Sequence, residues 1–268
     1  MKSRLPFIIG LTILVFLSTM AVLAPVMAPG SPTHQDLGED LHPPSREFLL
    51  GTDKLGRDVA SRVIYGARIS LLVGISTVGV SLLIGVLVGA LAGYFGGWID
   101  QILMRIVDIL LAFPGTLLAI AFTAVLGPGL VHVVLALCLI SWTGYARLVR
   151  GEILSLREKD FVLAAKALGG TPRRVILLHM VPNLLPSLLI QSTFGMAAAI
   201  IAEGALSFLG LGAQPPTPSW GSILNEGRQF LLVAPHLTTF PGLAIMIAVL
   251  GLNLVGDGLM ALMEKREN

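Results

Sequence analysis

The chain has 268 residues, of which 54% are hydrophobic and only 13% are charged, and its mean hydropathy is +0.85. Soluble domains carry about 25% charged residues, so this composition excludes an ordinary soluble protein and places the chain in a lipid bilayer. The net charge of +2 argues against a nucleic-acid partner, and the single Cys138 excludes a disulfide or cysteine-metal framework.

Uncharged runs along the chain predict six membrane-spanning helices, because a helix needs about 20 apolar residues to cross the hydrocarbon layer. The first run lies between Arg4 and the Pro-rich break at 29–32. We interpret it as a retained anchor rather than a cleaved signal peptide. A polar loop over 33–68 completes an N-terminal unit of residues 1–68, and the second spanning helix is expected within 69–99.

The other four spans are expected after residue 108. The apolar run over 109–146 has a Gly-Pro-Gly sequence near its middle and predicts two helices joined by a tight turn. The fifth and sixth runs cover about 183–211 and 237–257, and a polar tail follows. The sequence therefore predicts an all-α integral membrane protein whose core domain, residues 69–268, holds five spanning helices and a charged loop at about 150–182.

The distribution of basic residues predicts the orientation, since the cytoplasmic loops of membrane proteins are enriched in Lys and Arg. Six spans place both termini on the same side as the charged loop. The basic residues of that side are Lys2, Arg4, Arg105, Arg147, Arg150, Arg157, Lys159, Lys166, Arg173, Arg174, Lys265 and Arg266. Acidic residues slightly outnumber basic ones on the opposite side. We expect a multi-pass protein of a bacterial-type cytoplasmic (inner) membrane, surrounded by lipid, with both termini cytoplasmic.

The charged loop contains a short helix with defined ends. Ser155 and Glu158 have the spacing of a capping box at its start. Gly169-Gly170 provides a left-handed stop, and Thr171-Pro172 caps and begins a second helix. One face of the short helix is formed by Phe161, Ala164, Ala165 and Leu168. This small, Ala-rich face suits a groove on another protein, and contact with the lipid surface is the alternative.

Four sequence blocks resemble a known family. The stretch 161–169, followed by His-Met-Val-Pro-Asn at 179–183, resembles the Glu-Ala-Ala loop of ABC importer permeases. Three further blocks, at 50–70, 205–221 and 253–258, resemble the permeases of dipeptide, oligopeptide and nickel importers. The four blocks occur in the family's order and look most like the second, C-type permease of a pair. The chain departs from the family where Leu stands in place of the motif's Glu and in its C-terminal ending.

The resemblance implies a type I ABC importer permease fold and a role as the permease that carries dipeptides or oligopeptides across the membrane. Import of nickel or glutathione by the same family is the alternative. His132 and His179 have no partner at metal-ligand spacing, so no nickel site is predicted from them. An ion-coupled secondary transporter, which usually shows more spans and paired broken helices, is the remaining alternative class.

The resemblance also implies partners and the residues that contact them. The loop helix would dock on an ATPase subunit through Asp160, Phe161, Ala164, Ala165, Lys166 and Gly169. The chain has no Gly-x-x-x-x-Gly-Lys-Ser/Thr loop, so it is not expected to be an enzyme, and ATP and Mg would be bound by two separate ATPase subunits. A sister permease forming a heterodimer and an extracytoplasmic substrate-binding protein complete the expected assembly.

Three further features are candidates for function. Glu203 interrupts the fifth run and is expected either to line the translocation path or to hydrogen-bond a neighbouring helix. Contact with the binding protein is expected at Arg57, Asp58 and Trp220, and a rigid scaffold over the helix ends is the alternative. Gly residues at 85, 89 and 93 share one helix face and predict close helix packing.

Overall fold

The computed structural model describes residues 4–267, and within that range the regular structure is helical apart from one isolated bridge. The side chains of Lys2, Arg4, Lys265 and Arg266, which enter the orientation prediction, lie outside the described part. The elements are α1 (Arg4–Val22), α2 (Ala24–Met27), η1 (Leu37–Glu39), α3 (Val59–Phe95), α4 (Gly97–Leu111), α5 (Gly115–Leu126), α6 (Leu130–Leu156), α7 (Asp160–Ala167), α8 (Pro172–Arg174), the π-helical η2 (Val175–Met180), α9 (Val181–Phe208), α10 (Trp220–Gly227), η3 (Arg228–Phe230) and α11 (His236–Glu267).

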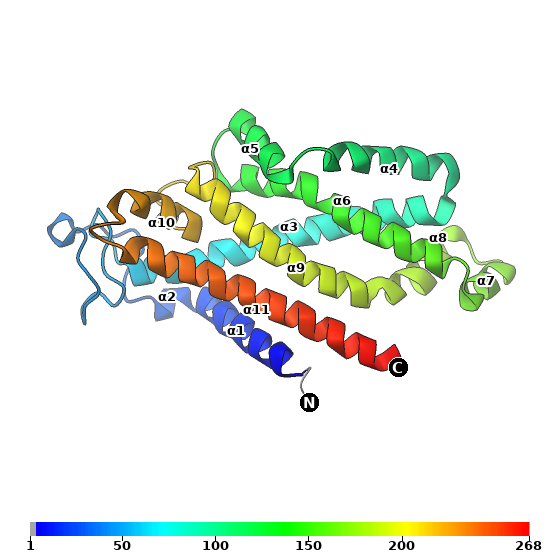
Figure 1. Ribbon diagram of the computed structural model, residues 1–268, viewed down its shortest axis with the longest axis horizontal. Coiled ribbons are helices and arrows are strands. Elements are labelled where there is room, and N and C mark those ends of the chain that lie inside the picture. Colours follow the sequence, from blue (N-terminus) through cyan, green and yellow to red (C-terminus); the bar gives the residue numbers. More distant parts are fainter. Residues whose placement is uncertain (1–3, 268) are drawn as a thin grey trace.

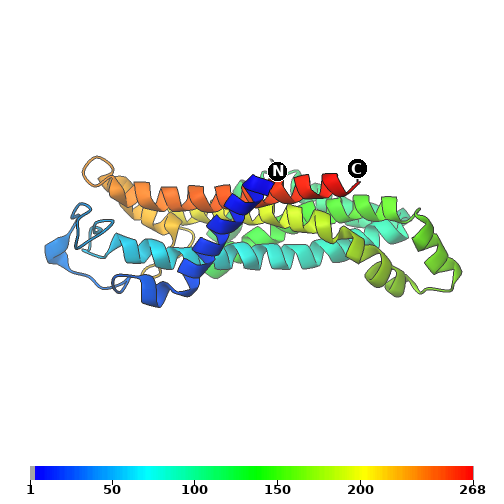
Figure 2. The same cartoon turned by 90° about the horizontal axis from the view of Figure 1, so that it is seen from below.

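The long helices lie side by side in an elongated bundle with two distinct ends (Figure 1). One end carries α7. The opposite end carries α10 and the segment between α2 and α3 (Figures 1 and 2). Helix α1 runs toward the α10 end and α11 runs away from it, so both ends of the chain point away from α10.

The six spans predicted from the sequence are confirmed as five long helices and one bent pair. Helices α1, α3, α6, α9 with its preceding turns, and α11 are each long and apolar enough to cross a membrane. Helices α4 and α5 pass the same test together but are bent by 83° at the break between them. Counting that pair as one span gives six.

The third span differs from its predicted form. A helix was expected to begin after residue 108, but α4 already begins at Gly97 and the break falls at Pro114. Proline disfavours helical geometry in the residue before it, Phe113, and α4 ends just before this point, at Leu111. The membrane-spanning pair tolerates the charges of Asp100 and Asp108 because both carboxylates form ion pairs with arginines of α6.

The second span also begins earlier than predicted. Helix α3 starts at Val59, so the expected division between residues 68 and 69 lies inside one continuous helix. The side chain of Asp58 caps this helix and accepts a hydrogen bond from the Ser61 amide at 2.7 Å. Arg62, in the first turn, is buried in ion pairs, so its charge does not interrupt the helix. Similarly, α11 continues through the stretch expected to be a polar tail.

Close packing of α3 against α6 confirms the prediction made from the three glycines. A Cβ atom on Gly89 would lie 2.5 Å from the Ala146 carbonyl oxygen and 2.8 Å from Val149 Cβ. A Cβ atom on Gly93 would lie 2.8 Å from Ile153 Cγ2. These distances leave no room for a side chain, so the two helix backbones touch along the glycine face.

Replacement of Gly89 by Leu is therefore expected to destabilise the protein. An added side chain must push the two helices apart, and overpacking costs about 1–3 kcal/mol. Thermal unfolding of the purified protein in detergent should show a melting temperature lowered by several degrees. The control is Gly151→Leu in α6, where a Cβ atom meets nothing within 4 Å. Equal melting temperatures for the two variants would contradict the packing argument.

Candidate functional site

Helix α7 packs against the bundle mainly through one apolar side chain. Val162 is fully buried and belongs to a cluster that includes Ile153 of α6 and Val175 and Ile176 of η2. These side chains come from three elements, α6, α7 and η2. Helix α7 is thus linked to the spanning bundle through η2, which leads directly into α9.

The end of α7 has the geometry that the sequence predicts. Gly169 has a positive φ of 83°, its amide donates to the Lys166 carbonyl at 2.9 Å, and the Gly170 amide donates to the Ala165 carbonyl at 3.0 Å. This pair of bonds is a Schellman motif, in which a non-glycine residue at the left-handed position is strained. The next segment begins with Pro172 and has Thr171 as its cap, as predicted.

The predicted start of α7 is wrong. Ser155, expected to cap this helix, lies inside α6, which continues to Leu156. The cap position is occupied by Lys159, whose side chain makes no capping hydrogen bond. Helix α6 persists because Ile153, in its last turns, is fully buried against the neighbouring helices.

The candidate coupling residues divide between two faces of α7. Asp160, Phe161, Ala164 and Gly169 are exposed. Ala165 and Lys166 are half-buried against the bundle, and the Lys166 ammonium lies 5.1 Å from the centre of the Tyr94 ring in α3. Such cation–π contacts stabilise by about 0.5–1 kcal/mol at exposed sites. The first group can contact a partner directly, while the second positions the helix.

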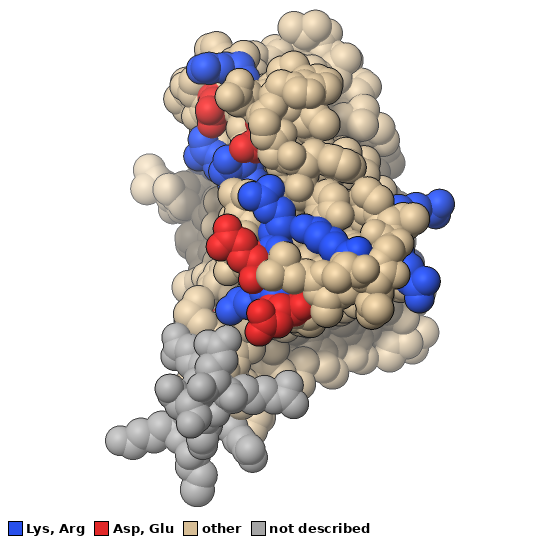
Figure 3. All heavy atoms as spheres, turned by 90° about the vertical axis from the view of Figure 1, so that its right-hand side faces the viewer, with Lys and Arg blue, Asp and Glu red and all other residues tan. Residues whose placement is uncertain are grey.

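The exposed face of α7 is more apolar than the sequence pattern suggested. Phe161 is 42% exposed, Leu163 is 50% exposed and Leu168 is 89% exposed. Leu163 is the leucine that stands in place of the Glu of the Glu-Ala-Ala motif, and the sequence assigned it no contact role. Figure 3 looks onto this end of the molecule, where Lys and Arg side chains and several acidic ones lie among uncharged residues. An exposed apolar patch with a charged surround is typical of a protein interface.

Two ion pairs fix α4 beside α6 toward the same end. Arg150 of α6 makes two hydrogen bonds to Asp100, one of them 2.6 Å long between Nη2 and Oδ2. Arg147 Nη2 lies 2.6 Å from Asp108 Oδ1. The Asp100 pair is half-buried, whereas the Asp108 pair is exposed and contributes little to stability.

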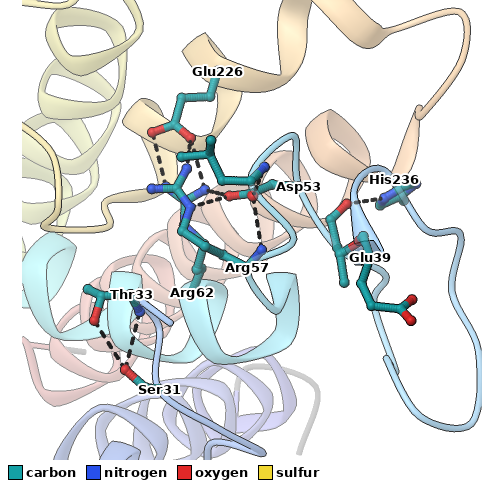
Figure 4. A network of polar contacts seen from close by, with 10 residues as sticks. Ser31, Thr33, Glu39, Asp53, Arg57, Arg62, Glu226 and His236 are labelled. Atoms are coloured by element: carbon teal, nitrogen blue, oxygen red, sulfur yellow. Dashed lines mark hydrogen bonds and ion pairs between the residues drawn. The ribbon is translucent and has the colours of Figure 1, made fainter. Parts of the chain in front are cut away.

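At the opposite end, four charged residues form a buried network (Figure 4). Asp53 accepts hydrogen bonds from the side chains of Arg57 and Arg62. Glu226 of α10 also accepts from both arginines, and Arg62 Nη1 lies 2.9 Å from Glu226 Oε2. The network joins the N-terminal loop, the start of α3 and α10. Only the Asp53–Arg57 spacing of four residues hints at it in the sequence, and nothing local indicates Glu226.

Burial corrects the expected contact role of two residues at this end. Arg57 is 3% exposed because it is held in the ion network. Trp220 is fully buried, packs against Gly66, and donates from Nε1 to the Val63 carbonyl at 2.9 Å. Neither side chain is available to a partner, so both belong to the scaffold alternative. Asp58 is half-buried, and its Oδ2 atom caps α3.

Glu203 lies inside the protein rather than along a groove. It is fully buried in α9, and its Oε1 accepts a 2.6 Å hydrogen bond from Ser207 Oγ. Ser207 Oγ in turn accepts from the Ala213 amide at 3.1 Å. A groove of about 250 Å³ between α5, α6 and α9 is lined by other residues of α9, such as Ala202 and Ala205. Ser207 belongs to the same helix, so this bond does not join Glu203 to a neighbouring helix, and both roles expected for Glu203 stay predictions.

We expect Arg62→Met to destabilise the protein strongly. The change removes one cation from a buried network, and an uncompensated buried carboxylate costs about 3–5 kcal/mol. Thermal unfolding in detergent should show a clear decrease in melting temperature. Arg46→Met, which changes an exposed arginine of the same loop, is the matched control. If both variants melt like the wild type, the network does not stabilise this end of the fold.

Two family descriptions match the chain. Residues 85–268 match the "Binding-protein-dependent transport system inner membrane component" family, and residues 2–44 match the "N-terminal TM domain of oligopeptide transport permease C". Among solved structures, the inward-facing MetNI methionine ABC transporter superposes with a TM-score of 0.59 at 21% identity. That superposition covers 74% of this chain and 95% of the MetNI chain, and it supports the fold alone.

Curated relatives agree with the family assignment. A dipeptide transport system permease of Alkalihalophilus pseudofirmus is 45% identical over 96% of this chain and 84% of its own length. A di/tripeptide transport system permease of Pseudomonas aeruginosa is 42% identical over 93% and 84%. A glutathione transport system permease of Pectobacterium atrosepticum is 47% identical over 81% and 72%. The chain therefore belongs to the binding-protein-dependent inner membrane transport components, with the fold of a type I ABC importer permease and the N-terminal domain of a C-type subunit.

Proposed function

We propose that this chain forms part of the translocation pathway of an ATP-driven importer of short peptides. The observation that carries the proposal is α7, an exposed short helix packed rigidly against α6 and η2 at one end of a spanning bundle. Relatives named for dipeptide and di/tripeptide transport match more than nine-tenths of the chain. Glutathione import is the second candidate, supported by a relative of similar identity over a shorter stretch.

The proposed mechanism uses α7 as the contact with an ATPase subunit. Asp160, Phe161, Ala164 and Gly169, all exposed, would enter a groove on that subunit, together with Leu168. Closure of two ATPase subunits around ATP and Mg would displace α7. The packing of α7 on α6 and η2 would pass this displacement to the spanning helices. Half-buried Ala165 and Lys166 would hold α7 at its angle rather than touch the partner.

The orientation and the other partners follow from the same proposal. Basic residues gather at the α7 end, which supports a cytoplasmic location for this end and for both termini. The α10 end would then face outward, with the ion network holding a platform for a substrate-binding protein. A single bundle with exposed apolar faces needs a sister permease to enclose a pathway, and we propose a heterodimer.

Ala164→Trp should uncouple ATP hydrolysis from transport. Ala164 is exposed, so the added indole does not disturb the bundle itself but blocks close approach of a partner. The purified transporter is expected to lose substrate-stimulated ATP hydrolysis and uptake while remaining assembled. Ala124→Trp, an exposed position in α5 away from α7, is the control. Wild-type coupling in Ala164→Trp would contradict docking through this face.

The substrate is tested by uptake in cells that lack the chain. Labelled dipeptides, longer peptides, glutathione and nickel are supplied in turn, with wild type or Ala164→Trp restored on a plasmid. We expect dipeptide uptake to be lost and to return only with the wild type. Loss of glutathione uptake instead would select the second candidate, and unchanged uptake of all four solutes would overturn the proposal.

A further inference from the structure

A long apolar groove runs between α3 and the continuous segment α8–η2–α9. Its volume is about 630 Å³. The walls come from Leu83, Leu87 and Phe95 on one side and Ile176 and Leu177 on the other, with further apolar neighbours. Among the described residues that line the groove, Arg173 is the only one with a polar side chain.

The groove has the length and the polarity of one lipid leaflet. Its α3 wall runs from Gly79 to Phe95, which at 1.5 Å per residue is about 24 Å. One leaflet with its headgroup layer is roughly 20 Å deep. Gly79 marks the deep end of the groove. Phe95, Pro172 and Arg173 mark the end nearest α7, where the chain leaves the spanning bundle.

We propose that this groove binds an anionic phospholipid of the leaflet on the α7 side, with an acyl chain along α3 and the phosphate on Arg173. The position of the single cation favours a lipid over a protein helix as the occupant of the groove. A helix from another subunit would need only apolar walls, whereas an anionic amphiphile needs apolar walls and one cation at the headgroup level. The guanidinium of Arg173, which is exposed, can bind a phosphate through two parallel hydrogen bonds.

Such a lipid would contact the segment that connects α7 to the membrane. Pro172, Arg173, Ile176 and Leu177 all line the groove, and the last two belong to the π-helical η2. π-helical turns inside helices are frequent at functional sites. Resting on the proposed function, the inference is that the bound lipid stiffens this connection and so sets how strongly ATP hydrolysis is coupled to transport.

The headgroup contact is tested by native mass spectrometry of the protein purified with its co-purifying subunits. The probes are phosphatidylglycerol and phosphatidylcholine supplied in mixed micelles. Arg173→Gln is expected to reduce retained phosphatidylglycerol about fivefold, the size of one basic residue's attraction to an anionic lipid surface. Arg174→Gln, which alters the adjacent arginine outside the groove lining, should retain the wild-type amount. Equal losses in both variants, or no loss in Arg173→Gln, would overturn the proposal.

The acyl-chain contact is tested by filling the deep end. A Cβ atom at Gly79 meets nothing within 4 Å, so Gly79→Leu projects into the groove without strain on the fold. We expect this variant to lose bound phosphatidylglycerol while the subunits stay assembled. Unchanged lipid retention would overturn the proposal, and so would dissociation of a sister subunit, because it would identify the groove as a protein interface. The number of bound lipids does not depend on uptake, so it can be interpreted even if the chain does not import peptides.

Discussion

The contact between α3 and α6 is the constraint on which the other elements depend. Three glycines at four-residue spacing let the two backbones touch, and α6 then presents Ile153 to the base of α7. In a bilayer, apolar side chains gain little by leaving lipid for another helix, so close van der Waals contact must stabilise the pair. The rigid α3–α6 pair therefore connects the α10 end of the molecule with the α7 end.

Charged residues strengthen the two ends of this pair in different ways. At the α10 end, Arg62 of α3 is locked between Asp53 and Glu226, which makes the outer platform a single unit with the helix. At the α7 end, the ion pairs between helices are more exposed. Lys166 lies against the Tyr94 ring, and the apolar side chains of Phe161 and Leu163 are 42% and 50% exposed. A fixed platform at one end and an incomplete surface at the other suit a subunit that receives a movement from a separate protein.

The sequence predicted the parts of the fold that depend on local chemistry. Apolar runs, the glycine face of α3 and the Gly169 stop each have a pattern within a few residues, and the structure confirms them. The predictions were wrong where the structure of a segment depends on residues far away in the sequence. The early start of α3 depends on Glu226, and charged α4 depends on arginines of α6. Trp220 looked like a surface anchor because nothing nearby in sequence reveals that its side chain packs against Gly66 of α3.

Cross-linking from the end of α7 shows whether this helix contacts an ATPase subunit. The single native Cys138 is buried, so a cysteine placed at Leu168, which is 89% exposed, reacts without competition at the surface. In membranes that contain the whole transporter, Leu168→Cys is expected to cross-link to an ATPase subunit, and the yield should change when ATP is added. Leu232→Cys, 98% exposed near the opposite end, should give no such product. Absence of an ATPase cross-link from Leu168→Cys would contradict coupling through α7.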